Sequence, residues 1–270
     1  MQPSLAFPRP GPALKGLLIV VGVLGVGLAL FFRTGVGQFV FQTLACVPEH
    51  VLHGQVWRLV TSGLLTSPDS YGHLIFTLLG LYFLSTDLEQ RWGGRRLLVF
   101  LATAVALGNG LAILVDLIAP AALSTFHVRS FMFGPEAAIG ATAVAWAQMN
   151  ADRQILLFFV VPVRGKYLTW VTLGFCVLGV IYPGAPPAGH IAPFGGLLTG
   201  LLFGGATSPA RRAWLGLKLF ILRRRLGDAA PPSAASIVRG GAGKRRPGSP
   251  PLRVVSGGQD KPPKDKRYLN

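Results

Sequence analysis

The chain has 270 residues, of which 51% are hydrophobic and only 13% are charged, and its mean hydropathy is +0.50. Soluble domains carry about 25% charged residues, so this composition excludes an ordinary soluble protein and indicates an integral membrane protein. The net charge of +16 does not indicate a nucleic-acid partner, because +12 of it lies after residue 207 and only +4 lies before.

Six apolar stretches with few charges are candidates for membrane spans, since a bilayer core about 30 Å thick needs about 20 apolar residues in a helix. After an N-terminal segment of residues 1–15, we expect them at residues 16–32, 70–86, 97–115, 131–151, 167–182 and 191–206. The first stretch resembles a signal peptide, but no small-residue cleavage site and soluble domain follow it, so we expect a retained helix. The sequence predicts an all-α membrane protein with a transmembrane domain over residues 16–206.

Basic residues on the short connections predict the orientation, because Lys and Arg accumulate on the cytoplasmic side of a membrane. With the N-terminus inside, eight Lys and Arg before the tail lie in the cytoplasm and three lie outside, namely Arg33, Arg58 and Arg129. An even number of spans also returns the tail, with 15 further basic residues, to the cytoplasm. We therefore expect both termini in the cytoplasm, at the cell (inner) membrane if the protein is bacterial.

Two connections are apolar but do not suit a span. Residues 33–69 should lie in the outer interface, where Trp57 and Arg58 form a pair typical of that region, with the arginine extending its charge toward water. Residues 154–163 number only ten, contain Pro162 and have basic residues on both sides. A short extended or interfacial segment on the cytoplasmic side is predicted there.

The C-terminal part divides into two segments. Residues 207–227 predict a basic amphipathic helix on the membrane surface, and anionic lipid headgroups are its expected partners. Residues 228–270 are rich in Pro, Gly, Ser and Lys and should be disordered. A tail that only sets the topology and anchors the chain to lipid, without a specific partner, explains the same charges.

Five motifs follow one another along the transmembrane domain. They are GQVWRLVTSGLL from Gly54, HLIFTLLGLYFL from His73, DLEQRWGG from Asp87, GPEAAIGA from Gly134 and GHIAPFGGLLTGLLFG from Gly189. In this order they resemble the core of the rhomboid family of intramembrane proteases, over residues 50–206. The resemblance implies a six-transmembrane-helix bundle, with both termini in the cytoplasm as the charges predict.

The residues on which rhomboid proteolysis depends are replaced in this chain. The family uses a serine in a GxSG motif on the fourth helix and a histidine on the sixth, since an intramembrane hydroxyl needs a nearby base. Glu136 stands at the serine position, Pro193 at the histidine position, and Thr77 in place of the asparagine four residues after His73. No catalytic residue is expected, and the resemblance implies an inactive pseudoprotease.

His73, Glu136 and His190 are expected near the outer face, as residues of a polar cavity. An ionisable group inside a membrane bundle is costly and often functional, and His190, His73 and Arg58 are candidate partners of Glu136. Structural interpretations stay open: Pro135 and Glu136 suit the first turn of a helix, and each histidine could cap a helix or hold a loop. Two candidate ligands do not make a metal site, so no metal or cofactor is predicted.

Small residues predict that the fourth and sixth helices approach each other closely. They recur at every fourth position, as Ala137, Ala141 and Ala145 in one helix and as Gly196, Gly200 and Gly204 in the other. Either stripe could instead serve homodimerisation.

The predicted function is the binding of transmembrane clients or partner proteins without cleavage, as the resemblance to inactive rhomboid relatives implies. The alternative is an intramembrane serine-type endopeptidase or hydrolase with a catalytic group relocated to the region of Glu136 and His190. Ser130 and Thr142 each lie six residues from Glu136 and do not replace a serine at that position. A small transporter or channel fits less well, because the spans carry few polar residues.

Overall fold

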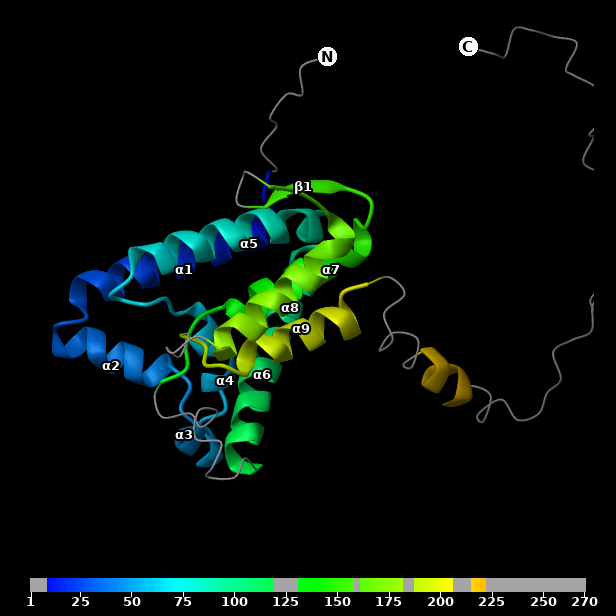
Figure 1. The fold of residues 1–270 in the computed structure, drawn as a ribbon. Coiled ribbons are helices and arrows are strands. Elements are labelled where there is room, and N and C mark those ends of the chain that lie inside the picture. Colours follow the sequence, from blue (N-terminus) through cyan, green and yellow to red (C-terminus); the bar gives the residue numbers. More distant parts are fainter. Residues whose placement is uncertain (1–8, 119–130, 158–160, 182–186, 206–214, 222–270) are drawn as a thin grey trace, which may run out of the picture. The chain divides into compact units, whose positions relative to one another are not determined.

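A computed structural model describes residues 9–118, 131–157, 161–181, 187–205 and 215–221 (Figure 1). Contacts divide the chain into two units, residues 1–217 and 218–270. The described part of the first unit is mostly helical. Residues 215–221 form a helix with exposed side chains, within the amphipathic segment predicted for 207–227. Residues 207–214 and 222–227 of that segment, and the predicted tail of residues 228–270, lie outside the described residues.

The described helices are α1 (Pro12–Phe31), α2 (Gly35–Leu44), α3 (Pro48–Leu52), α4 (Arg58–Thr61), α5 (Tyr71–Trp92), α6 (Gly94–Ile118), α7 (Glu136–Met149), α8 (Gly165–Ile181) and α9 (Ala192–Phe203). A short 3-10 helix, η1 (Ser62–Leu64), follows α4. By length and composition, α1 and α6 could each cross a membrane, whereas α8 and α9 are shorter apolar helices.

The segment between α7 and α8 is an antiparallel hairpin of β1 (Gln154–Leu157) and β2 (Val161–Arg164), in which Gln154 pairs with Arg164. The extended conformation predicted for residues 154–163 is therefore confirmed over both strands. The hairpin also makes the described fold mostly rather than entirely helical.

Glu89, near the end of α5, caps the first turn of α1, which lies alongside α5 (Figure 1). Its buried carboxylate accepts hydrogen bonds from the backbone N–H groups of Gly11, Ala13 and Leu14 at 2.8, 3.1 and 3.2 Å. The first amides of a helix have no partner within the helix and carry the positive end of its dipole. A single carboxylate therefore fixes the start of α1 against the end of α5.

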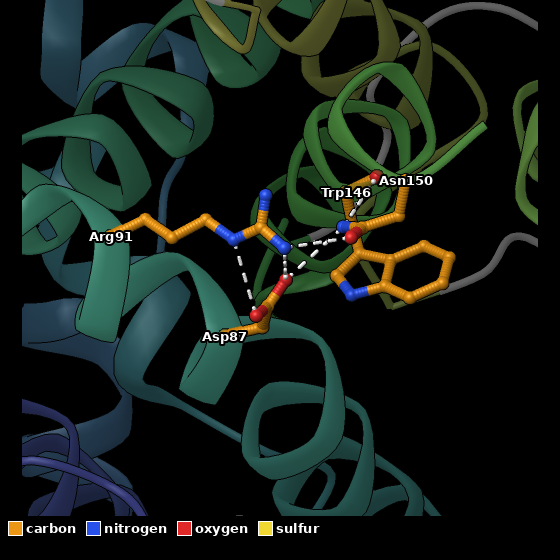
Figure 2. A network of polar contacts seen from close by, with 4 residues as sticks. All are labelled: Asp87, Arg91, Trp146 and Asn150. Atoms are coloured by element: carbon orange, nitrogen blue, oxygen red, sulfur yellow. Dashed lines mark hydrogen bonds and ion pairs between the residues drawn. The ribbon is translucent and has the colours of Figure 1, made fainter. Parts of the chain in front are cut away.

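A polar network joins the ends of α5 and α7, as Figure 2 shows. Arg91 contacts the Asp87 carboxylate at 3.1 Å and donates to the side-chain oxygen of Asn150 at 2.8 Å. The amide of Asn150 donates in turn to Asp87 and to the carbonyl oxygen of Trp146, both at 3.1 Å. The network adds a second hydrogen bond to the Trp146 carbonyl, which already accepts the backbone N–H of Asn150, and it ties the end of α5 to the end of α7.

The small-residue stripes of α7 and α9 face each other, and the predicted close approach is confirmed. A Cβ atom added at Gly196 would lie 2.0 Å from the carbonyl oxygen of Ala137, and one at Gly200 would lie 2.7 Å from that of Ala141. On its other side α9 contacts α6, where a Cβ at Gly195 would lie 2.5 Å from the Cα of Gly108. Because both stripes are used internally, neither is available for homodimerisation.

Arg58 differs from the predicted snorkelling residue. Its side chain is only 6% exposed, and its guanidinium donates to the carbonyl oxygens of Gln42 and Ala45, the latter at 2.8 Å, and to the side chain of Gln55. The last carbonyls of α2 lack donors within that helix, and the guanidinium of Arg58 supplies hydrogen-bond donors at that end. The adjacent Trp57 remains about half exposed. Arg58 therefore holds the outer connection together and is not a partner of Glu136.

The helix predicted to start at residue 131 begins only at Glu136. Before it, Met132 forms a β-bridge with Cys46, and the N–H of Gly134 donates to the carbonyl oxygen of Ser62 at 2.9 Å. Gly134 has a φ of +111°, which favours glycine. These residues are apolar enough to lengthen a membrane-spanning helix, but their hydrogen bonds to the outer connection hold the backbone in a non-helical, extended conformation.

Candidate functional site

A cavity of about 1010 Å³ lies among α5, α7 and α8, with the residues before and at the start of α9 at one end. Its walls are mainly apolar and include Phe76, Phe83, Trp146, Leu168 and Phe175. The polar residues of its lining include four that the sequence analysis named, His73, Thr77, Glu136 and His190. Pro193 also lines the cavity, so the fold brings all the predicted site residues to one place.

His73, in the first turn of α5, forms a hydrogen bond with Glu136, the first residue of α7. Its Nε2 lies 3.0 Å from the Glu136 Oε1, and its Nδ1 accepts from the backbone N–H of Ser67 at 2.9 Å. An amide N–H only donates, so Nδ1 carries no proton and the single ring proton lies on Nε2. His73 is thus a neutral imidazole that donates to the glutamate, and both of its nitrogens are engaged.

One oxygen of Glu136 has no hydrogen-bond partner among the described residues. Its Oε2 is buried and makes no hydrogen bond with any residue of the described part. The carboxylate lies against Gly134, where an added Cβ would be 2.1 Å from Oε2. A glycine at position 134 is therefore needed twice, for its positive φ and for the space that the carboxylate occupies. The Glu136 side chain thus lines the polar end of the cavity while one of its oxygens is packed against Gly134 without a donor.

His190, just before α9, is protonated at the other ring nitrogen. Its Nδ1 lies 2.7 Å from the carbonyl oxygen of Gly179 in α8. A carbonyl oxygen only accepts, so Nδ1 carries a proton and donates to it. The structure therefore pairs Glu136 with His73 and not with His190, although both histidines line the same cavity.

Within the described part, two threonines and no serine line the cavity. The rings of His73 and His190 make no hydrogen bond with a serine or threonine hydroxyl among these residues. Thr142 is fully buried, and its hydroxyl donates to the carbonyl oxygen of Ile139. Ser130 lies outside the described residues. Over the same part of the chain, no group of three or more His, Cys, Asp or Glu side chains could hold a metal ion.

Residues 16–204, more than two thirds of the chain, match the family described as "Eukaryotic integral membrane protein (DUF1751)". The chain belongs to the DUF1751 family. No curated protein matches it. This DUF1751 chain is thus an integral membrane protein, as its composition predicts. The family description refers to eukaryotic proteins, names no activity and does not mention rhomboid proteins. It gives no support to the bacterial inner membrane expected above.

Two parts of this DUF1751 site were missed from the sequence. Ser67 sets the proton position of His73 through a backbone N–H, which no side-chain pattern reveals. The apolar walls were also missed, because Phe76 and Phe175 have the same hydropathy as residues that face lipid. Glycines line the same cavity, Gly80 on α5, Gly140 on α7 and Gly179 on α8, and their positions were the available signal in the sequence.

Proposed function

We propose that this DUF1751 protein is a rhomboid-like pseudoprotease with six membrane spans, which binds the transmembrane helices of client proteins without cleaving them. The observation that carries the proposal is the apolar cavity of about 1010 Å³ whose polar end holds Glu136 where a rhomboid protease would place its serine. The order of the motifs from Gly54 to Gly204 and the close packing of α7 against α9 support the rhomboid-like bundle.

In the proposed topology, α1, α5, α6, α7, α8 and α9 cross the membrane, and both termini lie in the cytoplasm. The basic residues of the short connections support this orientation. The outer connection, with α2, α3, α4 and η1, then lies on the same side as His73, Glu136 and His190. The polar network of Asp87, Arg91 and Asn150 lies at the cytoplasmic end of the bundle.

The dimensions of the cavity suit a client helix. Its lining runs along α7 from Glu136 to Trp146, which lie ten positions apart, a rise of about 15 Å at 1.5 Å per residue. Phe76 on α5 and Phe175 on α8 also line it and are 65% and 53% exposed, so they would face lipid or a partner within the membrane. A transmembrane helix could pack against this opening and insert its side chains between α5 and α8.

The chemistry of the polar end argues against cleavage. Acyl transfer at a serine needs a hydroxyl and a base with a free nitrogen. Glu136 is a carboxylate, and both ring nitrogens of His73 are engaged by Ser67 and Glu136. His73 therefore has no lone pair with which to take a proton from a nucleophile.

The relocated-hydrolase alternative retains one supporting observation, since Glu136 and His190 line the same cavity. Its test is turnover of a transmembrane substrate by the parent protein and by the Glu136→Gln and His190→Ala variants. Turnover that disappears in both variants would establish the hydrolase, and its absence in the parent would reject it.

The binding proposal is tested with purified protein in lipid nanodiscs. A photoreactive phenylalanine analogue is placed at position 76 or 175, both in the cavity lining, or at position 23 of α1 as a control. Val23 is 66% exposed but does not line the cavity. We expect crosslinks to a single-span helix from positions 76 and 175 and few from position 23. Equal crosslinking at all three positions would refute the cavity as the binding site.

A serine-reactive activity probe and a transmembrane substrate test the absence of cleavage in the same preparation. We expect neither labelling nor product. Labelling that is lost in a Ser130→Ala variant would overturn the pseudoprotease proposal.

We also propose that the basic segment around residues 207–227 binds anionic lipid headgroups. The helix at 215–221 exposes Leu217, Phe220 and Ile221, and basic residues flank it in the sequence. A peptide of residues 207–227 should float with vesicles that contain phosphatidylserine and not with phosphatidylcholine alone, and salt should weaken its binding. Equal flotation with both vesicles would reject the electrostatic part.

A further inference from the structure

The polar end of the cavity favours one class of client over others. We propose that the preferred client helices carry a basic side chain, lysine or arginine, which pairs with Glu136 inside the bundle. This inference rests on the proposed function and specifies what the cavity recognises. It follows from the hydrogen bonds of the His73–Glu136 pair, from the carboxylate at the polar end of the cavity and from the depth of Glu136.

His73 does not neutralise Glu136. The distance of 3.0 Å between Nε2 and Oε1 would suit an ion pair, but the bond from the Ser67 N–H to Nδ1 requires the neutral ring. No arginine or lysine of the described part lies within 4.0 Å of the Glu136 carboxylate. Arg58, the cation of the outer connection, is bound to the carbonyls of Gln42 and Ala45. An ionised Glu136 therefore lacks a positive partner within the described protein.

The acceptors at the polar end fit a donor with several N–H groups. The Glu136 side chain lines the cavity and is 26% exposed, and one of its two oxygens, the buried Oε2, has no hydrogen bond in the described part. A lysine ammonium has three donors and an arginine guanidinium has five, and neither has an acceptor. A client with a carboxylate at this level would instead meet like charge. The cavity thus complements a basic group and disfavours an acidic one.

Glu136 lies at a depth where such a pair matters. α7 has 14 residues, or about 21 Å, against a hydrocarbon core of about 30 Å. If the network at Asn150 marks the cytoplasmic boundary, Glu136 lies about 10 Å below the outer boundary. A basic residue is costly at that depth unless it is paired, so the carboxylate selects for it. The client's lysine or arginine should lie about six residues from the outer end of its span.

The experiment uses designed single-span helices of about 21 leucine and alanine residues in nanodiscs with the full-length protein. One helix carries lysine six residues from its outer end. Three controls carry leucine there, glutamate there, or lysine six residues from the cytoplasmic end. Crosslinking from position 76 is titrated against helix concentration for the parent protein and for Glu136→Gln. Glutamine can still accept from His73 but has no charge.

We expect the outer lysine helix to bind the parent protein at least about tenfold more tightly than the leucine helix, a difference of 1.4 kcal/mol. The glutamate helix and the inner lysine helix should bind no better than leucine, and Glu136→Gln should remove the preference. Equal binding of the outer lysine and leucine helices would overturn this inference and leave the proposed function intact. If none of the helices crosslinks to position 76 in the cavity, both this inference and the proposed function are overturned.

A preference for lysine that persists in Glu136→Gln would also contradict the inference, since it would place the recognition elsewhere. Circular dichroism and a detergent unfolding curve establish that the variant is folded. The comparison of the four helices on the parent protein decides the matter even if the variant is unstable.

Discussion

Replacement of Gly196 by alanine tests the packing on which the bundle and its cavity depend. The new Cβ would lie 2.0 Å from the carbonyl oxygen of Ala137 and 2.6 Å from its Cα, whereas ordinary contact begins near 3.4 Å. To reach ordinary contact, α9 would have to move about 1.4 Å away from α7, which is the difference between 3.4 Å and 2.0 Å. Since the obstructing atoms belong to the backbone of α7, no side-chain rotation can substitute for that movement.

The neighbouring helix opposes the shift. A Cβ at Gly195 would be 2.5 Å from the Cα of Gly108, so α9 already touches α6 on its other side. Overpacking of a well-packed core costs about 1–3 kcal/mol, and this wedged position should reach about 3 kcal/mol. Because Pro193 lies less than one turn from Gly196 and lines the cavity, client crosslinking should fall as well.

The matched control is Gly27→Ala in α1, the same change in another apolar helix. Nothing lies within 4 Å of a Cβ at Gly27, so alanine should be neutral or stabilise the helix by about 0.5–1 kcal/mol. Unfolding in mixed micelles of increasing sodium dodecyl sulfate, followed by circular dichroism, measures both free energies. If the two variants unfold alike, α7 and α9 do not approach as closely as described and the reasoning fails.

Three further changes probe the polar contacts. Glu89→Gln should lower the free energy of unfolding by about 1–3 kcal/mol, because a charged acceptor of three α1 amides becomes neutral, whereas Gln90→Ala should change it by less than about 0.5 kcal/mol. In a double-mutant cycle, Arg91→Ala and Asn150→Ala should show a coupling of about 0.5 kcal/mol or more; strict additivity would mean that the network in Figure 2 does not act as a unit. Burial raises the pKa of the Cys46 thiol from 9.0 to about 12, although a nearby positive charge opposes the shift. The unfolded chain then releases a proton above pH 9 that the folded chain keeps, so stability should fall between pH 9 and pH 12, and Cys46→Ala should reduce that fall. If the stability of the parent and of the variant depends on pH in the same way, the Cys46 thiol does not contribute to the fall.

The sequence predicted the helical regions better than it predicted their starts. Hydropathy located the helix that contains Glu136, but that helix begins five residues later than residue 131. Residues 131–134 are held extended by bonds to Cys46 and Ser62, which are more than 70 residues away in the chain. A local pattern does not contain such pairings, and for the same reason it placed the Arg58 guanidinium in water instead of among the carbonyls of α2.

The sequence by itself determined which residue types meet at the candidate site. It also determined that α7 and α9 pack through small residues. Residues four positions apart lie on one face of a helix, so each small-residue stripe can be found within its own helix, and such faces allow close approach. Only the tertiary structure decided that Glu136 pairs with His73, that Ser67 keeps this histidine neutral, and that α5, α7 and α8 line an apolar cavity. His73 and Glu136 are 63 residues apart in the chain, and a hydrogen bond between them acts over only about 3 Å, so it depends on how the helices are shifted and rotated against one another.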